Sequence, residues 1–369
     1  MHYLATLGIE LPVIQAPMAG VQGSALALAV CRAGGLGSLP AALMTAEDLR
    51  AELLRLREGT DRPFNVNFFA HQNPVPDAPR EAGWRQALAP YYQEFGIDPT
   101  TIPAGPGRQP FSEASTALVE EFRPAIVSFH FGLPAEHLLA RVRASGAKIW
   151  ASATTVDEAR WLEARGIDAI IAQGLEAGGH RGMFLSDEVT TQLGTFALLP
   201  QIVAAVRCPV IAAGGIATPA GVAAARALSA AAVQVGTAYL CCPEATTSPL
   251  HRAALLSAAA RHTALTNLFS GRPARGIVNR VMRELGPLCP AAPAFPLATA
   301  AIAPLRAAAE KAGSSDFTPL WCGENASACR EVSAAELTRQ LAAGWSLQPD
   351  RLRPVAATEP FTAEGARLC

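Results

Sequence analysis

The chain has 369 residues, half of them apolar, so it is long enough to bury one large hydrophobic core or two ordinary ones. Its 30 basic and 31 acidic residues leave a formal net charge of −1, which argues against nucleic acid or an anionic membrane surface as a partner. No apolar run reaches the roughly 18 residues that a membrane span needs, and the N-terminal sequence lacks the features of a signal peptide, so we expect a cytoplasmic protein.

Short apolar runs recur along the chain, and each ends in glycine, proline or a small polar residue. Apolar residues on both faces are typical of parallel strands that are covered on each side. Helical patterns with clear start or stop residues follow most of these runs. The predicted strands are 12–18, 35–40, 64–69, 125–131, 148–154, 169–174, 209–215 and 232–240, and the predicted helices are 24–33, 45–57, 134–145, 155–165, 194–206 and 218–228.

This alternation predicts an α/β fold, a closed (β/α)8 or TIM barrel, because parallel strands need a crossover between them. An open, doubly wound parallel sheet is the alternative. Two segments do not fit the repeat. Residues 71–124 are rich in proline and aromatic residues, and residues 241–320 carry a helical stretch at 251–269, a basic run at 270–283 and a Pro/Ala-rich linker.

Long insertions on the carboxyl side of barrel strands commonly build lids and substrate walls. We therefore expect residues 1–240 to form the barrel and residues 241–320 to form a smaller, mainly helical substrate or lid domain inserted after the last barrel strand. Residues 321–369 are expected to close on the barrel, because Leu337 and Leu341 lie four apart in a helical pattern at 332–343. The eight cysteines include no C-x-x-C pair and no histidine at metal-ligand spacing, so we expect reduced thiols and no metal site.

Two glycine-rich strand ends predict a phosphate site. The seventh predicted strand ends in Ala-Ala-Gly-Gly-Ile-Ala (212–217) before a helix, and the eighth carries Gln-Val-Gly-Thr (234–237). Such ends bind phosphate because backbone N–H groups approach its oxygens and a helix N-terminus adds its positive end. The expected donors are Gly214, Gly215, Gly236 and Thr237. The alternative is that these glycines only permit tight turns.

Two histidines are expected on the same face of the barrel. The glycine-rich loop 173–182 contains His180, and the fourth strand supplies His130 near its carboxyl end. An imidazole at the mouth of a barrel is a candidate acid–base catalyst, although a structural role is the alternative for each. We interpret the other histidines as surface or packing residues, namely His2, His71, His137, His251 and His262.

Six motifs, in chain order, resemble the motif set of the nitronate monooxygenases. The resemblance spans residues 12 to about 345. The motifs are Val-Ile-Gln-Ala-Pro-Met-Ala-Gly (13–20), Phe-Asn-Val-Asn-Phe-Phe (64–69), Val-Ser-Phe-His-Phe-Gly (127–132), Gln-Gly-Leu-Glu-Ala-Gly-Gly-His-Arg-Gly (173–182), Ile-Ala-Ala-Gly-Gly-Ile (211–216) and Phe-Ser-Gly-Arg-Pro-Ala-Arg-Gly (269–276).

The resemblance implies an FMN-dependent barrel that uses dioxygen to oxidise alkyl nitronates, such as propionate 3-nitronate, to a carbonyl compound and nitrite. It implies His180 as the active-site histidine and His130 as the second histidine beside it. It leaves a homodimer open. The cofactor contacts that it implies are Pro17 and Met18 against the isoalloxazine, hydrogen bonds from Asn67 and Gln173, a close approach of Gly178, and Gly215, Gln234, Gly236 and Thr237 at the phosphate end.

Residues 286–303 depart from the family pattern, because Phe295 and Thr299 stand in a segment where members often have tyrosines. The substrate preference therefore does not follow from the resemblance. Arg272, Arg275 and Lys311 are candidates for attracting an anion, and solvated surface charge is their alternative role.

Two other functions compete with this one. The same flavin barrel could be a reductase that passes hydride from NAD(P)H to a quinone or an enoyl thioester, because fold alone does not decide function. A flavin-free isomerase or lyase is less compatible, because such barrels use a lysine or carboxylate at a strand end. The chain has only Lys148, at the start of its strand, and Lys311. A non-catalytic binding module would leave the two histidines without a purpose.

Overall fold

The computed structural model describes residues 2–102 and 108–347. The barrel strands are β1 (Val13–Gln15), β2 (Ser38–Pro40), β3 (Asn65–Phe69), β4 (Ile126–His130), β5 (Lys148–Ala153), β6 (Ala169–Gln173), β8 (Val210–Ala213) and β9 (Ala232–Val235). They form one 8-stranded parallel sheet in the order β1-β9-β8-β6-β5-β4-β3-β2. The sheet closes because Gln15 N donates to Leu36 O and Leu36 N donates to Val13 O. The predicted closed barrel is confirmed, and the open sheet is excluded.

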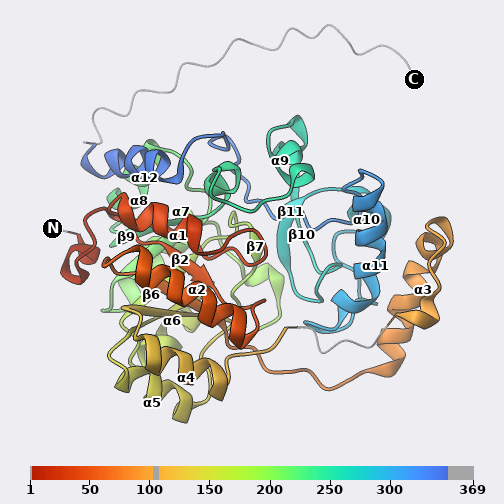
Figure 1. The fold of residues 1–369 in the computed structure, drawn as a ribbon, viewed down its shortest axis with the longest axis horizontal. Coiled ribbons are helices and arrows are strands. Elements are labelled where there is room, and N and C mark those ends of the chain that lie inside the picture. Colours follow the sequence, from red (N-terminus) through yellow and green to blue (C-terminus); the bar gives the residue numbers. More distant parts are fainter. Residues whose placement is uncertain (1, 103–107, 348–369) are drawn as a thin grey trace, which may run out of the picture.

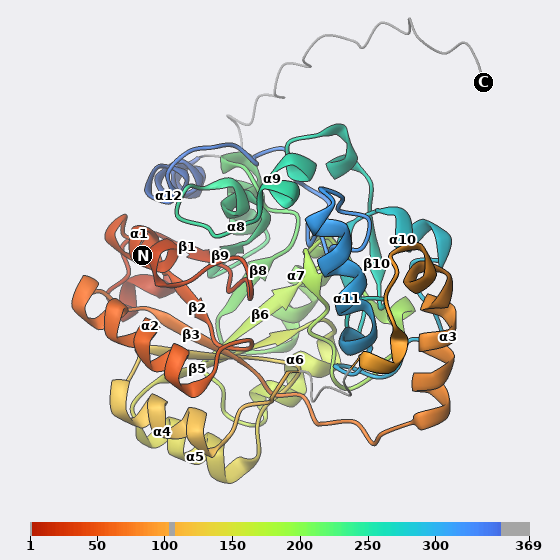
Figure 2. The ribbon, with the colours of Figure 1, turned by 45° about the vertical axis from the view of Figure 1, so that its right-hand side comes forward.

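Helices surround this barrel (Figure 2). They begin where the sequence supplies caps: the Thr45 hydroxyl accepts from Asp48 N, and the Thr155 hydroxyl accepts from Glu158 N. The helix α12 packs against α1 and α8, at the place predicted for a closing helix. The bounds are α1 (Ser24–Arg32), α2 (Ala46–Gly59), α4 (Glu113–Phe122), α5 (Glu136–Ala144), α6 (Val156–Glu163), α7 (Thr195–Ala205), α8 (Pro219–Ala227) and α12 (Ala334–Ala343).

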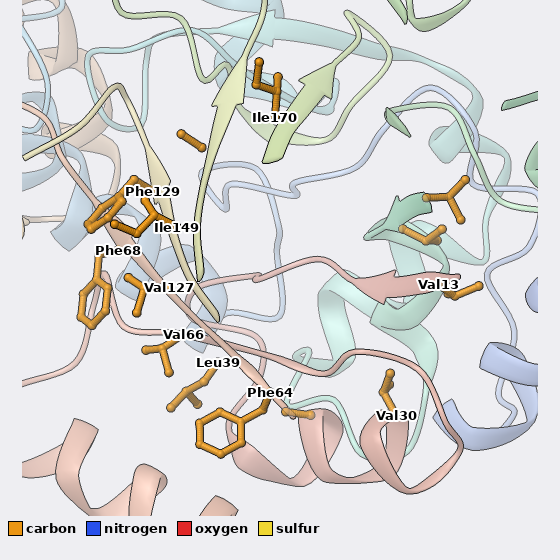
Figure 3. Close-up of a cluster of buried hydrophobic side chains, with 14 of the residues drawn as sticks. Val13, Val30, Leu39, Phe64, Val66, Phe68, Val127, Phe129, Ile149 and Ile170 are labelled. Carbon is orange, nitrogen blue, oxygen red and sulfur yellow. The ribbon is translucent and has the colours of Figure 1, made fainter. Parts of the chain in front are cut away.

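Barrel side chains alternate between two cores, as the two-residue period of a strand requires. The outer core lies between strands and helices and includes Val13, Val66, Phe68, Val127 and Phe129 (Figure 3). The inner core holds the side chains that alternate with these, among them Ile14, Ile126, Trp150, Ile171 and Ile211. Leu4, from the 3₁₀ helix η1 (Tyr3–Leu7), joins the inner core together with Ile9. The amino end of the barrel is therefore filled, and space for a ligand lies at the carboxyl end.

A second layer stands beside the carboxyl ends of the strands (Figure 1). It contains a 3-stranded antiparallel sheet of β10 (Thr263–Thr266), β11 (Ala274–Ile277) and β7 (Gly179–His180). Its helices are α3 (Ala78–Glu94), α9 (Pro249–Leu255), α10 (Arg280–Glu284) and α11 (Ala298–Lys311). Trp84 Nε1 donates to Ala298 O at 3.2 Å, and Tyr92 Oη donates to Ala301 O at 2.7 Å. The insertion after β3 and the segment after β9 thus share one hydrophobic cluster.

Three predictions of local structure are wrong. The strand predicted at 232–240 ends at Val235, and Thr237–Cys241 forms the 3₁₀ helix η4. The helix predicted at 251–269 ends at Leu255, because residues 263–266 pair with β11. The Pro/Ala-rich linker contains the start of α11, because alanine favours helix strongly.

The second layer is not purely helical, since it contains the sheet that includes β7. The domain boundaries at residues 240 and 320 stay a prediction. Of the predicted closing segment, residues 348–369 lie outside the described residues. No helix within residues 2–102 and 108–347 has the length and apolar character to cross a membrane.

Candidate active site

A cavity opens at the carboxyl ends of the barrel strands and encloses about 1330 Å³ of empty space, its mouth included. Every residue predicted for the site lines this cavity: Pro17, Met18, Asn67, His130, Gln173, Gly178, His180, Gly214, Gly215, Gln234, Gly236 and Thr237. The roles of these residues stay predictions. Their convergence follows from the barrel, which brings the carboxyl ends of all its strands to one face.

The glycines at the ends of β8 and β9 serve two different purposes. Gly214 and Gly215 have φ of +111° and +69°, a region that favours glycine. A Cβ on Gly214 would lie only 2.9 Å from Thr195 Oγ1. Gly236 has an ordinary φ of −112°. A Cβ there would meet Ala16 Cβ at 3.4 Å and the sulfur of Met18 at 3.7 Å. The absence of a side chain at Gly236 therefore keeps the cavity open.

Two amide side chains present oxygen atoms at the cavity. Asn67 Nδ2 donates to Ser128 Oγ at 2.9 Å and to Ser128 O at 3.2 Å, which fixes its orientation. Gln234 Oε1 is buried and has no hydrogen-bond partner among the described residues. An unsatisfied buried acceptor costs roughly 1–3 kcal/mol. A ligand that donates a hydrogen bond to Gln234 would remove this cost.

Buried glutamines fix the chain that follows β1. Met18 N donates to Gln22 Oε1 at 3.0 Å, and Gln15 Nε2 donates to the same oxygen at 2.6 Å. Gln22 Nε2 in turn donates to Ser38 O at 2.6 Å. The backbone at Pro17 and Met18 is therefore held rigidly against the cavity.

The loop between β6 and β7 is held by Gln173 and Arg181. Gln173 Nε2 donates to His180 O at 3.0 Å, and Gln173 Oε1 accepts from Gly182 N at 2.7 Å. The fully buried Arg181 donates to Gly174 O and to Gln173 O, both at 2.7 Å. Gly178 packs so closely that a Cβ would lie 2.6 Å from Gly323 N. Gln173 and Gly178, which are both predicted to contact the cofactor, therefore also have structural roles. The Gln173 side chain holds the loop, and the absence of a side chain at Gly178 allows the close packing.

His130 has both ring nitrogens engaged. Nε2 lies 3.1 Å from His180 O, a carbonyl that can only accept, so Nε2 carries the proton. Nδ1 then accepts from Ser152 Oγ at 3.0 Å. Burial lowers the pKa of His130 to about 3, so the ring is neutral at neutral pH. This geometry favours a positioning role for His130, which holds the backbone of the other histidine.

His180 accepts a hydrogen bond at Nε2. Nε2 lies 2.8 Å from Ser270 Oγ and 3.2 Å from Arg108 Nη1. Because a guanidinium only donates, Nε2 is the acceptor and the proton sits on Nδ1. Burial, followed by the positive charge of Arg108, lowers the pKa of His180 well below its usual value. The imidazole is therefore neutral at neutral pH, and Nε2 can take a proton once its hydrogen bond from Arg108 is exchanged for a contact with a substrate.

Aromatic rings surround this histidine. The ring centroids of Phe69, Phe131, Phe295 and Trp321 lie 6.1, 6.0, 5.5 and 5.4 Å from the centroid of His180. Phe295 belongs to the segment that departs from the family pattern, and its ring packs against His180 without itself lining the cavity. These apolar rings lower the polarity around the imidazole.

Sequence reasoning missed three residues here. Arg108 lines the cavity beside His180. His251 also lines the cavity, and His71 is buried and donates through Nε2 to Arg108 O at 3.1 Å, so neither histidine is a surface residue. Residues 71 and 108 lie in a long connection without a regular pattern, and only packing brings them to the site.

The three cations proposed from the sequence have contacts of their own outside the lining of the cavity. Arg275 pairs with Glu324 at 2.9 Å, and Lys311 is exposed at the end of α11. The Cζ atom of Arg272 lies 4.3 Å from the ring centroid of Phe131. None of the three cations lines the cavity.

The fold and the position of the cavity define the class of protein first: this is a TIM-barrel enzyme, with its site at the carboxyl face of the barrel. The model of the nitronate monooxygenase family matches residues 2–344. The chain therefore belongs to the nitronate monooxygenase family and is an oxidoreductase.

Individual relatives agree with this assignment. The chain is 44% identical over 363 residues to the nitronate monooxygenase of Paraburkholderia phytofirmans, which covers 96% of this chain and 97% of that protein. It is 44% identical over 343 residues to that of Pseudomonas aeruginosa, covering 92% and 97%. The solved structure of nitroalkane oxidase from Streptomyces ansochromogenes is 41% identical, with a TM-score of 0.83 over 92% of this chain and 97% of that one. The resemblance inferred from the sequence motifs is confirmed.

Proposed function

We propose that this protein uses FMN and dioxygen to oxidise alkyl nitronates, such as propionate 3-nitronate, to a carbonyl compound and nitrite. The observation that supports this proposal is the pairing of Arg108 with a neutral His180 inside the aromatic part of the cavity. A cation beside an uncharged base suits a substrate that arrives as an anion.

The residues at the other end of the cavity fit FMN. Gly214, Gly215 and Gly236 offer backbone N–H groups at the two strand ends where barrels commonly bind phosphate. Gln234 Oε1 offers a buried acceptor to a donor group of the cofactor. When bound, FMN supplies the capacity to take electrons from an organic substrate and pass them to dioxygen.

The residues of the chain bind and orient the substrate. A nitronate already carries the electron pair that is removed, so it needs no deprotonation. Arg108 and Trp321 line the cavity, where Arg108 attracts the charge of the nitronate, and the rings of Trp321 and Phe295 make the surroundings of His180 apolar. If a neutral nitroalkane is bound instead, Nε2 of His180 takes the proton from its carbon, a step of general-base catalysis that typically contributes about 10²–10⁴-fold.

The test is an assay without any nicotinamide cofactor. We expect the purified protein to be yellow, to release FMN on acid treatment, and to consume oxygen and form nitrite from propionate 3-nitronate without NAD(P)H. Rapid flavin reduction by NADH with no reaction toward nitronates would select the reductase instead. Release of FAD, or a colourless protein that does not take up FMN, would overturn the cofactor proposal.

A further inference from the structure

Arg108 is a largely buried cation without a carboxylate partner among the residues that the structure describes. Its guanidinium makes one hydrogen bond to a described side chain, from Nη1 to His180 Nε2 at 3.2 Å. Burial lowers the pKa of Arg108 to about 10, so it is still charged at neutral pH. A buried charge without a counter-charge is costly, and an anion in the cavity would offset that cost.

Arg108 has contacts that hold both its backbone and its guanidinium. His71 Nε2 donates to the backbone oxygen of Arg108 at 3.1 Å. The Cζ atom of Arg108 lies 5.5 Å from the ring centroid of Phe295, and the edge of the His71 ring packs against the same phenyl group at 4.8 Å. A guanidinium fixed in this way presents its planar fork of donors with little further loss of side-chain entropy on binding.

The other arginines around this part of the site have contacts of their own. Arg181 donates to carbonyl oxygens of its own loop, and Arg275 is paired with Glu324. Arg272, whose charge also acts on His180, donates to Met183 O and lies over the ring of Phe131, outside the lining of the cavity. Arg108 is the one arginine or lysine among the described residues that line the cavity. The one acidic residue of that lining, Glu176, accepts from Thr195 N and Thr195 Oγ1 at the start of α7.

We propose that Arg108 forms an anion subsite that binds the two oxygens of a nitronate through its guanidinium fork. This inference rests on the proposed function and adds the residue that recognises the charge. The ligand class is a planar oxyanion with two oxygens on one side, because such an anion matches the paired N–H groups of a guanidinium. Nitronates, the nitrite product and inorganic nitrate all have this shape.

The experiment compares the holoenzyme with three variants. Arg108→Met keeps an unbranched apolar stem and removes the guanidinium with its charge, and Arg108→Lys keeps the charge and removes the fork. The matched control is Arg306→Gln. Arg306 carries a positive charge that acts on Arg108 from α11, but it pairs with Glu310 at 2.8 Å and does not line the cavity.

Two quantities are measured: the Kd of nitrate by calorimetry and the KM of propionate 3-nitronate. Because Arg108→Met loses charge-assisted hydrogen bonds, it should raise both the Kd of nitrate and the KM of the nitronate by about 10- to 100-fold. The KM of a neutral nitroalkane, which has no charge before reaction, should change far less. The Kd and KM of Arg108→Lys should lie between those of the wild type and of Arg108→Met. Those of Arg306→Gln should stay within about twofold of the wild-type values.

The proposal is overturned if Arg108→Met retains its flavin and binds nitrate and the nitronate as wild type does. It is also overturned if Arg306→Gln loses as much affinity for nitrate and the nitronate as Arg108→Met does. The general positive charge of this region, and not a contact with Arg108, would then explain the effect. If Arg108→Met loses its flavin, Arg108→Gln carries the same comparison. A wild-type enzyme that binds nitrate through Arg108 but does not oxidise nitronates would refute the proposed function and leave the subsite standing.

Discussion

Gly236 allows the phosphate end of the cavity to be probed without disturbing the fold. Its φ of −112° suits any residue, and an added Cβ would lie 3.4 Å from Ala16 Cβ and 3.7 Å from the sulfur of Met18. We therefore expect Gly236→Ala to change the free energy of unfolding of the cofactor-free protein by less than about 0.5 kcal/mol. The new methyl group would stand where a phosphate approaches the backbone.

The expected loss of cofactor affinity follows from the hydrogen bonds at stake. A backbone N–H that donates to a charged group contributes roughly 1.5–3 kcal/mol, so loss of one should weaken FMN binding about 10- to 100-fold. Gly215→Ala is the matched variant. Its φ of +69° should cost a residue with a Cβ about 1–2 kcal/mol of stability even without FMN. Thermal unfolding of the cofactor-free chains and fluorescence titration with FMN measure the two effects separately.

Two results would refute this reasoning. If Gly236→Ala folds normally and binds FMN as wild type does, the phosphate does not lie at the end of β9. If the two variants lose the same stability without cofactor, the positive φ of Gly215 is not the source of its cost. A variant with weaker FMN binding and unchanged stability is the outcome that supports the site as described.

Three further predictions concern the histidines. His180→Asn should lose about 10²–10⁴-fold in kcat/KM on neutral nitroalkanes and far less on nitronates, and equal losses in steady-state assays would mean that His180 only positions the anion. The kcat/KM for a nitronate should show no inflection near pH 6.5, because the lowered pKa of His180 keeps it neutral there; such an inflection in the pH profile would contradict this. The charged or titratable groups that face His180 are Arg108, Arg272, His71 and His130. Lowering the pH from about 7 to about 5 should lower the Tm measured by calorimetry. The pKa values of His130 and His251 in the folded protein are about 3 and about 4, below those of the unfolded chain, so the unfolded chain binds more protons in this range. An unchanged Tm would refute this.

The barrel could be predicted because its signals are local. Runs that are apolar on both faces became buried strands, and threonines such as Thr45 and Thr155 capped the helices that follow. The second layer could not be predicted in the same way. Residues 263–266 become a strand only because β11 pairs with them, and α11 is stabilised by packing on α3, which lies far away in the sequence.

The same distinction between local and long-range signals applies to the residues of the site. Pro17, His180 and Gly236 lie at strand ends or in the loops that follow them, and parallel strands of a barrel bring such ends together. Arg108 and His71 lie in the long connection between β3 and α4, where no periodicity or motif marks them. Only the contact of His71 with the backbone of Arg108, and of both with Phe295, makes them part of the site.

The pairing of α3 with α11 also sets an order of events during translation. The hydrogen bond from Trp84 to Ala298 joins residues 214 positions apart. At typical synthesis rates α3 leaves the ribosome on the order of 10–40 s before its partner exists. During that interval the apolar face that carries Trp84, Leu88 and Tyr92 has no cover from α11. A nascent chain stopped before α11 would present this face to other proteins, so we expect chaperones to bind α3 during that interval.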